Sequence, residues 1–202
     1  SLNILGMVGL SCYILADTFF VSNGLGINGL TALNLVIPIY SLIRGVGLML
    51  GIGGATKYTI FNSQGKLKRA NKIFTTTVLI SFIFSCLFIV AAILFGDTIT
   101  AFLGANQSVF AMTKKYLMTL LFFSPAFLLN DIFVCFIRND NSPKLSMLSM
   151  LVGSMCNIVL DYIFIFPLNM GIFGAALATG FAPIIGLLIL SMHIYKKKNN
   201  FH

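Results

Sequence analysis

The chain has 202 residues, of which 58% are hydrophobic and only 9% charged, and its mean hydropathy is +0.98. So little polar surface cannot cover a soluble globule, and the apolar residues come in runs of about twenty, which predicts an integral membrane protein. The net charge of +8 does not indicate nucleic-acid binding. Most lysines and arginines lie in short segments beside the apolar runs, as charges that set membrane topology do.

Several apolar stretches are each long enough to cross a bilayer as a helix. We expect six of them, over residues 2–21, 30–58, 70–95, 115–137, 146–166 and 172–195. The sequence therefore predicts an all-α, polytopic membrane protein, a bundle of six transmembrane helices that forms a single membrane domain over residues 1–202.

The connections between these spans differ in charge. The first and fifth connections carry no basic residue, whereas the second and fourth and the segment after the last span carry Lys66, Lys68, Arg69, Lys72, Arg138, Lys144 and Lys196–Lys198. The positive-inside rule places the basic side in the cytoplasm. We therefore expect a multi-pass protein of the cytoplasmic membrane of a bacterial cell, with both termini cytoplasmic.

Only five acidic residues occur, and Asp17, Asp131 and Asp161 lie inside apolar stretches. A carboxylate near mid-membrane costs roughly 2.5 to 3.5 kcal/mol on insertion scales, so each one needs a partner ion, a buried cation or a proton. Asn157 precedes Asp161 by one helical turn and lies on the same helix face. These positions are where function is expected.

Depth along the helices groups four of the polar residues. At about 1.5 Å per residue, Asp17 and Asp161 lie roughly 8 Å below the outer ends of the first and fifth spans, with Asn157 and Thr179 slightly deeper. Oxygen ligands at one depth are what a hard cation such as Na⁺, or a transferable proton, requires. The alternative is a purely structural hydrogen-bonded network between packed helices. Apart from the ion, no cofactor is expected.

A faint internal repeat relates the first and last hairpins. Gly26-Ile27-Asn28-Gly29, followed by Pro38, recurs as Gly171-Ile172-Phe173-Gly174, followed by Pro183. At this offset Asn34 aligns with Thr179, which makes Asn34 a further polar candidate. The alternative is that glycine is simply common where membrane helices turn or pack closely.

Arg44 and Asp131 are the remaining charges within the spans. By the same counting, Arg44 lies near the middle of the second span and Asp131 about 9 Å above the inner surface. A buried pair would relieve the insertion cost of both. Two alternatives are that Arg44 faces a water-filled cleft and meets substrate, or that Asp131 pairs with Arg138.

Signals of an enzyme are weak. The string Gly24-x-Gly26-x-x-Gly29 matches a dinucleotide fingerprint, but it lies in an uncharged turn with no strand before it. The only histidines, His193 and His202, lie at the cytoplasmic end, so a zinc hydrolase within the membrane would lack ligands. We expect no enzymatic activity.

Short motifs follow one another through nearly the whole chain. They are Ala16-Asp17-Thr18-Phe19-Phe20-Val21, Gly26-x-x-Gly29-x-x-Ala32, Ile37-Pro38-Ile39, Gly51-x-Gly53-Gly54-Ala55, Gln64-Gly65-Lys66-Leu67-Lys68-Arg69-Ala70, Tyr116-Leu117, Arg138-Asn139-Asp140, Asn157-x-x-x-Asp161 and Gly171-x-x-Gly174-Ala175-Ala176-x-Ala178-Thr179. In their order and spacing they resemble the multidrug and toxic compound extrusion (MATE) transporters, and specifically the amino-terminal six-helix half of these proteins.

The resemblance implies an antiporter with two six-helix lobes, in which inward flow of Na⁺ or H⁺ drives export of drugs or organic metabolites. It implies an ion- or proton-coupling site at Asp17, Asn157, Asp161 and Thr179, with Asn130 as an additional polar position. It implies an amphipathic or cationic small-molecule substrate, membrane lipid, and a carboxy-terminal six-helix lobe or a second copy as partners. Arg44 departs from the family pattern, which has an uncharged residue there.

Two other functions stay open at this point. One is a flippase for lipid-linked precursors from the same superfamily, which would need a basic cavity, and Arg44 is the only candidate for one. The other is a truncated, non-transporting membrane subunit, because the sequence contains only six spans.

Overall fold

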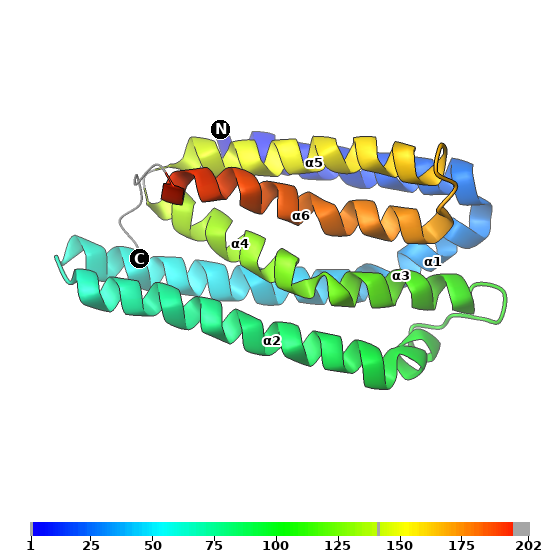
Figure 1. The fold of residues 1–202 in the computed structure, drawn as a ribbon, viewed down its shortest axis with the longest axis horizontal. Coiled ribbons are helices and arrows are strands. Elements are labelled where there is room, and N and C mark those ends of the chain that lie inside the picture. The colour runs from blue at the N-terminus through cyan, green and yellow to red at the C-terminus, as the bar shows by residue number, and fades with distance from the viewer. Residues whose placement is uncertain (1, 141, 196–202) are drawn as a thin grey trace.

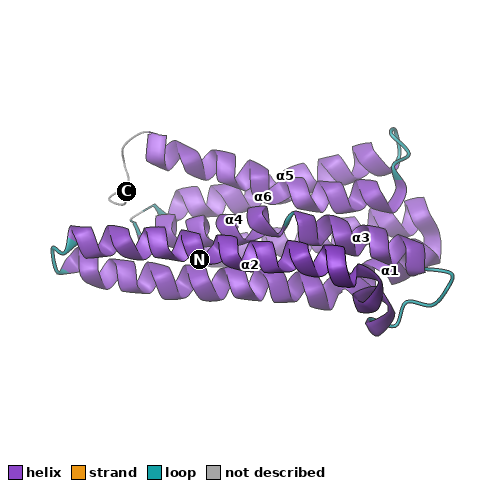
Figure 2. Ribbon diagram, turned by 60° about the horizontal axis from the view of Figure 1, so that its bottom comes forward, coloured by secondary structure: helices purple, strands orange, loops and turns teal. Residues whose placement is uncertain are grey.

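The computed structural model describes the backbone of residues 2–140 and 142–195, and the side chains of residues 15–140 and 142–192. Within these residues the regular structure is helical: α1 (Leu2–Ser63), α2 (Leu67–Phe102), α3 (Phe110–Phe122), α4 (Ser124–Asn139), α5 (Pro143–Ile165) and α6 (Gly171–Tyr195). The helices lie roughly along one axis, with their connections gathered at two ends (Figures 1 and 2). We name these the Gly26 end and the Ser63 end. The predicted basic residues Lys196–Lys198 lie outside the described residues.

Helix α1 contains both the first and the second predicted spans. It consists of two helices joined across a kink at Gly26, where φ is 67° and ψ is −161°. Glycine adopts this backbone conformation readily because it has no Cβ. The limb over residues 2–25 runs to the Gly26 end, and the limb over residues 27–63 returns from it (Figure 1). The connection predicted over residues 22–29 is therefore a sharp kink rather than a loop.

The last hairpin has related backbone features. Gly171, at the start of α6, also has a positive φ, of 63°. Pro38 lies inside α1 and Pro183 inside α6, each at the same distance along the chain from its glycine. Proline is tolerated within membrane helices because neighbouring helices and side chains satisfy the freed backbone groups.

The fourth predicted span, over residues 115–137, is not one straight helix. Helix α3 ends at Phe122, α4 begins at Ser124, and the two axes are bent by 48°. Pro125 explains the break, because it has no backbone N–H and its ring clashes with the carbonyl group four residues earlier. It is tolerated in the first turn of α4, where the missing donor has no helical partner.

By length and composition, four helices within the described residues can cross a membrane, and the bent pair α3 and α4 makes a fifth. Helix α1, which is counted once among them, reverses direction at Gly26. The predicted fold class, an all-α polytopic membrane protein, is confirmed.

Helix α2 has its apolar side chains on the outside of the bundle. Leu79, Ile83 and Leu87 are exposed, whereas its buried residues are small or carry a hydroxyl group: Ala70, Thr77, Ser81, Ser85, Ala92, Gly96 and Thr100. The Ser85 and Thr100 hydroxyls donate hydrogen bonds to carbonyl oxygens of their own helix, at 2.8 and 2.7 Å. Small inward-facing residues let helix backbones approach closely, which is how helices associate in lipid.

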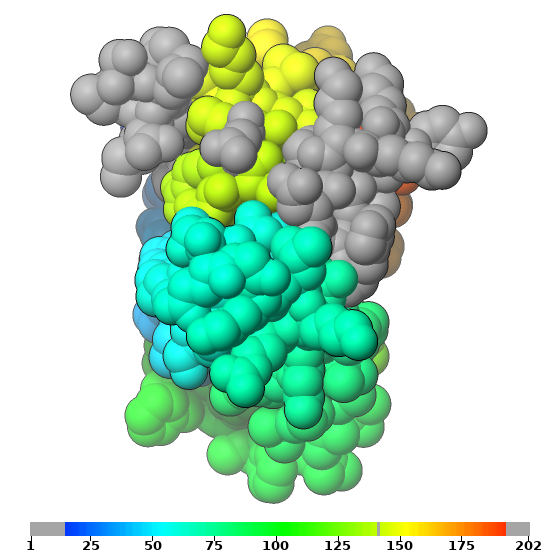
Figure 3. Space-filling model, turned by 90° about the vertical axis from the view of Figure 1, so that its left-hand side faces the viewer, coloured from blue at the N-terminus to red at the C-terminus, as the bar shows by residue number. Residues whose placement is uncertain are grey.

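Helices α5 and α6 share the most extensive contact, and α1 packs on both α4 and α5. This arrangement encloses the polar residues between α1, α4, α5 and α6. The Ser63 end, viewed in Figure 3, carries the α1–α2 connection (cyan to teal) and the α4–α5 connection (yellow-green). The described basic residues of these two connections, from Lys66 to Lys72 and from Arg138 to Lys144, lie at this end.

Candidate functional site

Helix α5 contributes two polar residues that are completely buried. Asn157 and Asp161 are both 0% exposed and lie one turn apart on the same face of the helix. Neither the amide atoms of Asn157 nor the carboxyl oxygens of Asp161 have a hydrogen-bond partner among the described residues. Buried polar groups are normally hydrogen-bonded, so these unpartnered atoms are available to a ligand or a proton.

Asp17 reaches the same region from the first limb of α1. Its side chain is buried, and its Oδ1 atom has no hydrogen-bond partner within the described part of the chain. The Asp17 and Asp161 carboxyl groups are close enough to interact electrostatically. Two carboxyl groups are therefore brought together in a region shielded from water.

Thr179, on α6, completes the predicted set. Its hydroxyl donates a hydrogen bond to the Ala175 carbonyl oxygen at 3.1 Å, and the hydroxyl oxygen can still accept. Thr179 is buried, with 5% of its surface exposed. We call Asp17, Asn157, Asp161 and Thr179 the polar layer.

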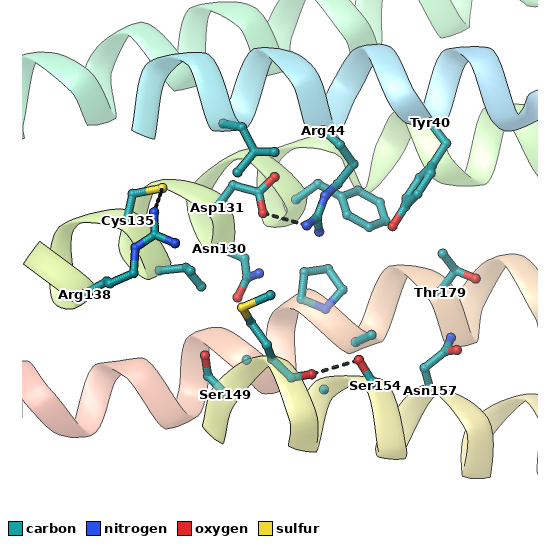
Figure 4. Close-up of a pocket in the computed structure, with 18 residues that line it drawn as sticks. Tyr40, Arg44, Asn130, Asp131, Cys135, Arg138, Ser149, Ser154, Asn157 and Thr179 are labelled. Atoms are coloured by element: carbon teal, nitrogen blue, oxygen red, sulfur yellow. Dashed lines mark hydrogen bonds and ion pairs between the residues drawn. The ribbon is translucent and has the colours of Figure 1, made fainter. Parts of the chain in front are cut away.

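Two cavities meet at this layer, and Thr179 and Tyr40 line both. The first, of about 170 Å³, is lined by Asp17 and Tyr116 among others, and we call it the Asp17 cavity. The second, of about 110 Å³, is lined by Asn157 and by Arg44, and we call it the Arg44 cavity (Figure 4). The polar layer is thus reached from two sides.

Tyr116, on α3, also lies at this site, although no role was predicted for it. It lies beside Thr179 and within electrostatic reach of both Asp17 and Asp161. Its only sequence signal was its place in the motif Tyr116-Leu117, because an uncharged tyrosine near the end of a predicted span is unremarkable by itself. Tyr40, which packs edge-on against Phe127 at 5.5 Å between ring centroids, was likewise missed.

The structure brings Arg44 and Asp131 together. The Arg44 Nη2 atom lies 3.1 Å from Asp131 Oδ1, and the two side chains are 21% and 3% exposed. The other carboxyl oxygen, Asp131 Oδ2, is buried without a hydrogen-bond partner among the described residues. Arg138, the alternative partner for Asp131, instead contacts the Cys135 sulfur at 3.7 Å (Figure 4).

The two additional polar candidates have different positions. Asn130 is buried, lines the Arg44 cavity and faces Gly186 of α6, where a Cβ atom would lie only 2.5 Å from the Asn130 Oδ1. Asn34 is exposed on α1 and lines neither cavity. Asn34 therefore lies apart from the polar layer, although Thr179, its partner in the repeat, belongs to the layer.

Within the described residues, no three His, Cys, Asp or Glu side chains converge as transition-metal ligands would. Apart from the two carboxyl groups, the polar layer offers neutral oxygens from an amide and a hydroxyl. Oxygen ligands of this kind suit a hard monovalent cation or a shared proton.

Comparison with known proteins agrees with this fold. The sequence profile of the MatE family matches residues 3–163. The multidrug export protein MepA of Staphylococcus aureus (strain MRSA252) is 26% identical over 170 residues, which cover 84% of this chain and 38% of MepA.

Solved structures share the whole arrangement of helices. An outward-facing multidrug resistance MATE family transporter has a TM-score of 0.90 and 26% identity, over 98% of this chain and 44% of that one. The MATE multidrug transporter DinF-BH, in complex with R6G, has a TM-score of 0.90 and 28% identity, over 100% and 46%. A MOP superfamily transporter from Pyrococcus furiosus has a TM-score of 0.88 and 27% identity, over 96% and 43%.

The chain therefore spans less than half the length of each of these relatives. The family profile covers most of the chain, and its described helices follow those of the solved transporters. This chain belongs to the MATE family and matches the amino-terminal half of a MATE transporter.

Proposed function

We propose that this chain is the amino-terminal lobe of a cation- or proton-coupled antiporter that exports drugs or organic metabolites across the cytoplasmic membrane. The observation that carries the proposal is the polar layer, in which buried oxygens of Asp17, Asn157 and Asp161 lack partners among the residues described. Membership of the MATE family supports export, and the related MepA is named a multidrug export protein.

The chemistry of the layer supports ion coupling. Two neighbouring carboxylates cannot both be ionised in a dry site without a cation, because desolvation and like charge each disfavour the charged form. Asp17 and Asp161 must therefore share a proton or enclose Na⁺. The Asn157 amide oxygen and the Thr179 hydroxyl supply neutral ligands in either case, and Na⁺ would add backbone carbonyl groups or water.

Transport by alternating access needs two helical bundles that move around a shared cleft. The described helices form one bundle, so a carboxy-terminal six-helix lobe, or a second copy of this chain, supplies the other. We propose an amphipathic or cationic small molecule as substrate and lipid around the exposed apolar helix faces. As one lobe of such a transporter, the chain would take part in moving solutes, and we expect no enzymatic reaction.

The flippase alternative depended on Arg44 as the start of a basic cavity. In the structure Asp131 lies 3.1 Å from this guanidinium and pairs with it. A lipid phosphate would have to compete with a carboxylate already in place. This observation favours the antiporter.

Thermal unfolding of the purified transporter tests ion binding at the layer. If Na⁺ is the coupling ion, it should stabilise the wild type relative to K⁺ at equal ionic strength, by about 2.7 kcal/mol when Na⁺ is at 100 times its Kd. Asp161→Asn should remove this stabilisation. If the proton is the coupling ion, Na⁺ should have no effect, and wild-type export should follow a pH gradient in Na⁺-free buffer. Absence of both effects in the wild type would contradict the proposal.

A further inference from the structure

The Arg44 cavity extends away from the polar layer toward the Ser63 end. It lies between α1 and α4 on one side and α5 and α6 on the other (Figure 4). Asn157 and Thr179 line it at one end and Arg138, close to the end of α4, at the other. The cavity therefore connects the proposed coupling residues with the basic end of the bundle.

Polar side chains are spread along the cavity, between apolar residues such as Leu48 and Met150. Asn130 Oδ1 and Asp131 Oδ2 are buried acceptors with no hydrogen-bond partner in the described part of the chain. The Ser149 and Ser154 hydroxyls donate hydrogen bonds to carbonyl oxygens of their own helix, at 2.8 and 2.9 Å, and their oxygens can still accept hydrogen bonds. Because a water molecule takes up about 30 Å³, a cavity of 110 Å³ that contains these polar groups can hold a short file of water.

Arg44 places a positive charge beside this file. Its guanidinium is held by Asp131 at 3.1 Å, between Asn130 and Tyr40 in the view of Figure 4. A fixed arginine beside a narrow polar passage excludes cations and protons while water can still enter. The carboxylate that holds Arg44 is itself 3% exposed, so the pair is anchored inside the lobe.

We propose that the Arg44 cavity is a water-filled passage from the polar layer to the cytoplasmic side, and that the Arg44–Asp131 ion pair is its cation gate. The gate stops cytoplasmic Na⁺ and hydronium from reaching an empty polar layer, which keeps ion movement coupled to transport. This inference rests on the proposed function, because it assigns a second entrance to the same coupling site.

Access to the passage is tested by cysteine labelling. Ser154→Cys is introduced after the native cysteines are replaced by alanine. The protein is treated with Ag⁺, a cation small enough for the cavity, and an impermeant thiol reagent then measures how much of the cysteine Ag⁺ has protected. In everted vesicles, cytoplasmic Ag⁺ should react slowly with the cysteine at position 154. Met155→Cys is the matched control, because Met155 neighbours Ser154 but is 68% exposed on the outer face of α5. Ag⁺ that enters through the passage should not react with the cysteine at position 155.

The gate is tested by removing its charges together. In an Arg44→Gln and Asp131→Asn double variant, Ag⁺ should react several-fold faster with the cysteine at position 154. The guanidinium, which is 21% exposed, no longer opposes the cation, and the carboxylate removed with it is only 3% exposed. Lys144→Gln removes a charge from an exposed lysine at the same end and should leave the rate unchanged. The double variant leaves no unpaired charge buried, and Arg44→Gln alone serves if it fails to insert.

Ion leak provides the second readout. Liposomes containing the double variant should leak Na⁺ or protons without substrate, and adding Asp161→Asn should abolish that leak. The passage would be overturned if Ag⁺ failed to react at position 154 both in the protein with the ion pair intact and in the double variant. The gate would be overturned if Ag⁺ reacted at equal rates in these two proteins. If Ag⁺ reacts as predicted but the wild type neither binds nor couples an ion, the passage stands and the proposed function fails.

Discussion

At the scale of single residues, the unpartnered atoms of the polar layer bear on the two interpretations that the sequence left open, ion binding and a structural network. A structural network would join buried polar groups to one another by hydrogen bonds. Asn157 is fully buried, yet neither its Nδ2 nor its Oδ1 has a partner among the described side chains or backbone groups. A buried amide without partners weakens the fold, so its presence favours a ligand.

Asn157 should therefore make the folded protein less stable than an apolar residue of similar size would, while it contributes to ion binding. We predict that Asn157→Leu, which fills similar space without polar atoms, raises the free energy of unfolding by about 1 kcal/mol or more while abolishing coupled export. Denaturant titration and transport of the same preparations measure both. Ser146→Ala is the control, because the Ser146 hydroxyl donates to the Val134 carbonyl oxygen at 3.0 Å between helices. That change should lower stability by about 1 kcal/mol, and equal destabilisation by both variants would contradict a ligand role for Asn157.

The residues that counting along the helices grouped at one depth are those that the structure gathers, because helical rise is nearly constant whatever the packing. That grouping was available from the sequence for Asp17, Asn157, Asp161 and Thr179. The rotation of each helix about its axis could not be predicted from the sequence. For this reason Asn34 was proposed as a polar candidate although it lies on an exposed face. Tyr116 was missed because its neighbours come from other helices. Ion binding by the layer stays a prediction.

At the scale of elements, the break between α3 and α4 is held by contact with α6. Phe123, the residue at the break, lies against Gly180, where a Cβ atom would come within 2.5 Å of the Phe123 ring. The same ring packs edge-on against Phe181, at 5.5 Å between centroids. The backbone of α6 and the bend in the broken span therefore fit one another.

We predict that Gly180→Ala destabilises the protein by roughly 1 to 3 kcal/mol, because the added methyl group pushes the Phe123 ring out of place. Gly53→Ala is the matched control, since nothing lies within 4 Å of a Cβ atom there. Its effect should be neutral or slightly stabilising, because alanine favours helix more than glycine does. Thermal unfolding of the two variants gives the comparison, and a Gly180→Ala protein as stable as Gly53→Ala would refute the packing argument.

The helices themselves were largely predictable, because apolar length is a strong signal in membrane proteins. Their ends and interruptions were less so. Pro125 signals the break within residues 115–137, but proline inside a membrane helix does not always interrupt it, as Pro38 and Pro183 demonstrate. The difference depends on tertiary contacts such as that between Phe123 and Gly180, which sequence periodicity does not report.

At the scale of the whole molecule, charge asymmetry predicts orientation. We propose that the Ser63 end faces the cytoplasm with both termini, because the described basic connections lie there. With the native cysteines replaced, an impermeant reagent should label Asn106→Cys but not Ser63→Cys in intact cells. Both residues are exposed, so accessibility alone does not separate them. Labelling at position 63 but not at position 106 would show that the protein has the opposite orientation.

Gradient-driven export in liposomes, using the complete transporter that contains this lobe, tests the central claim most directly. Export of an organic cation is measured under a Na⁺ gradient at equal pH, and then under a pH gradient without Na⁺. The wild type should respond to one gradient, and Asp17→Asn and Asp161→Asn to neither. Asp97→Asn, which changes a 67% exposed carboxylate paired with Lys114, should export like the wild type. Wild-type export by both Asp17→Asn and Asp161→Asn would contradict the coupling role of the polar layer.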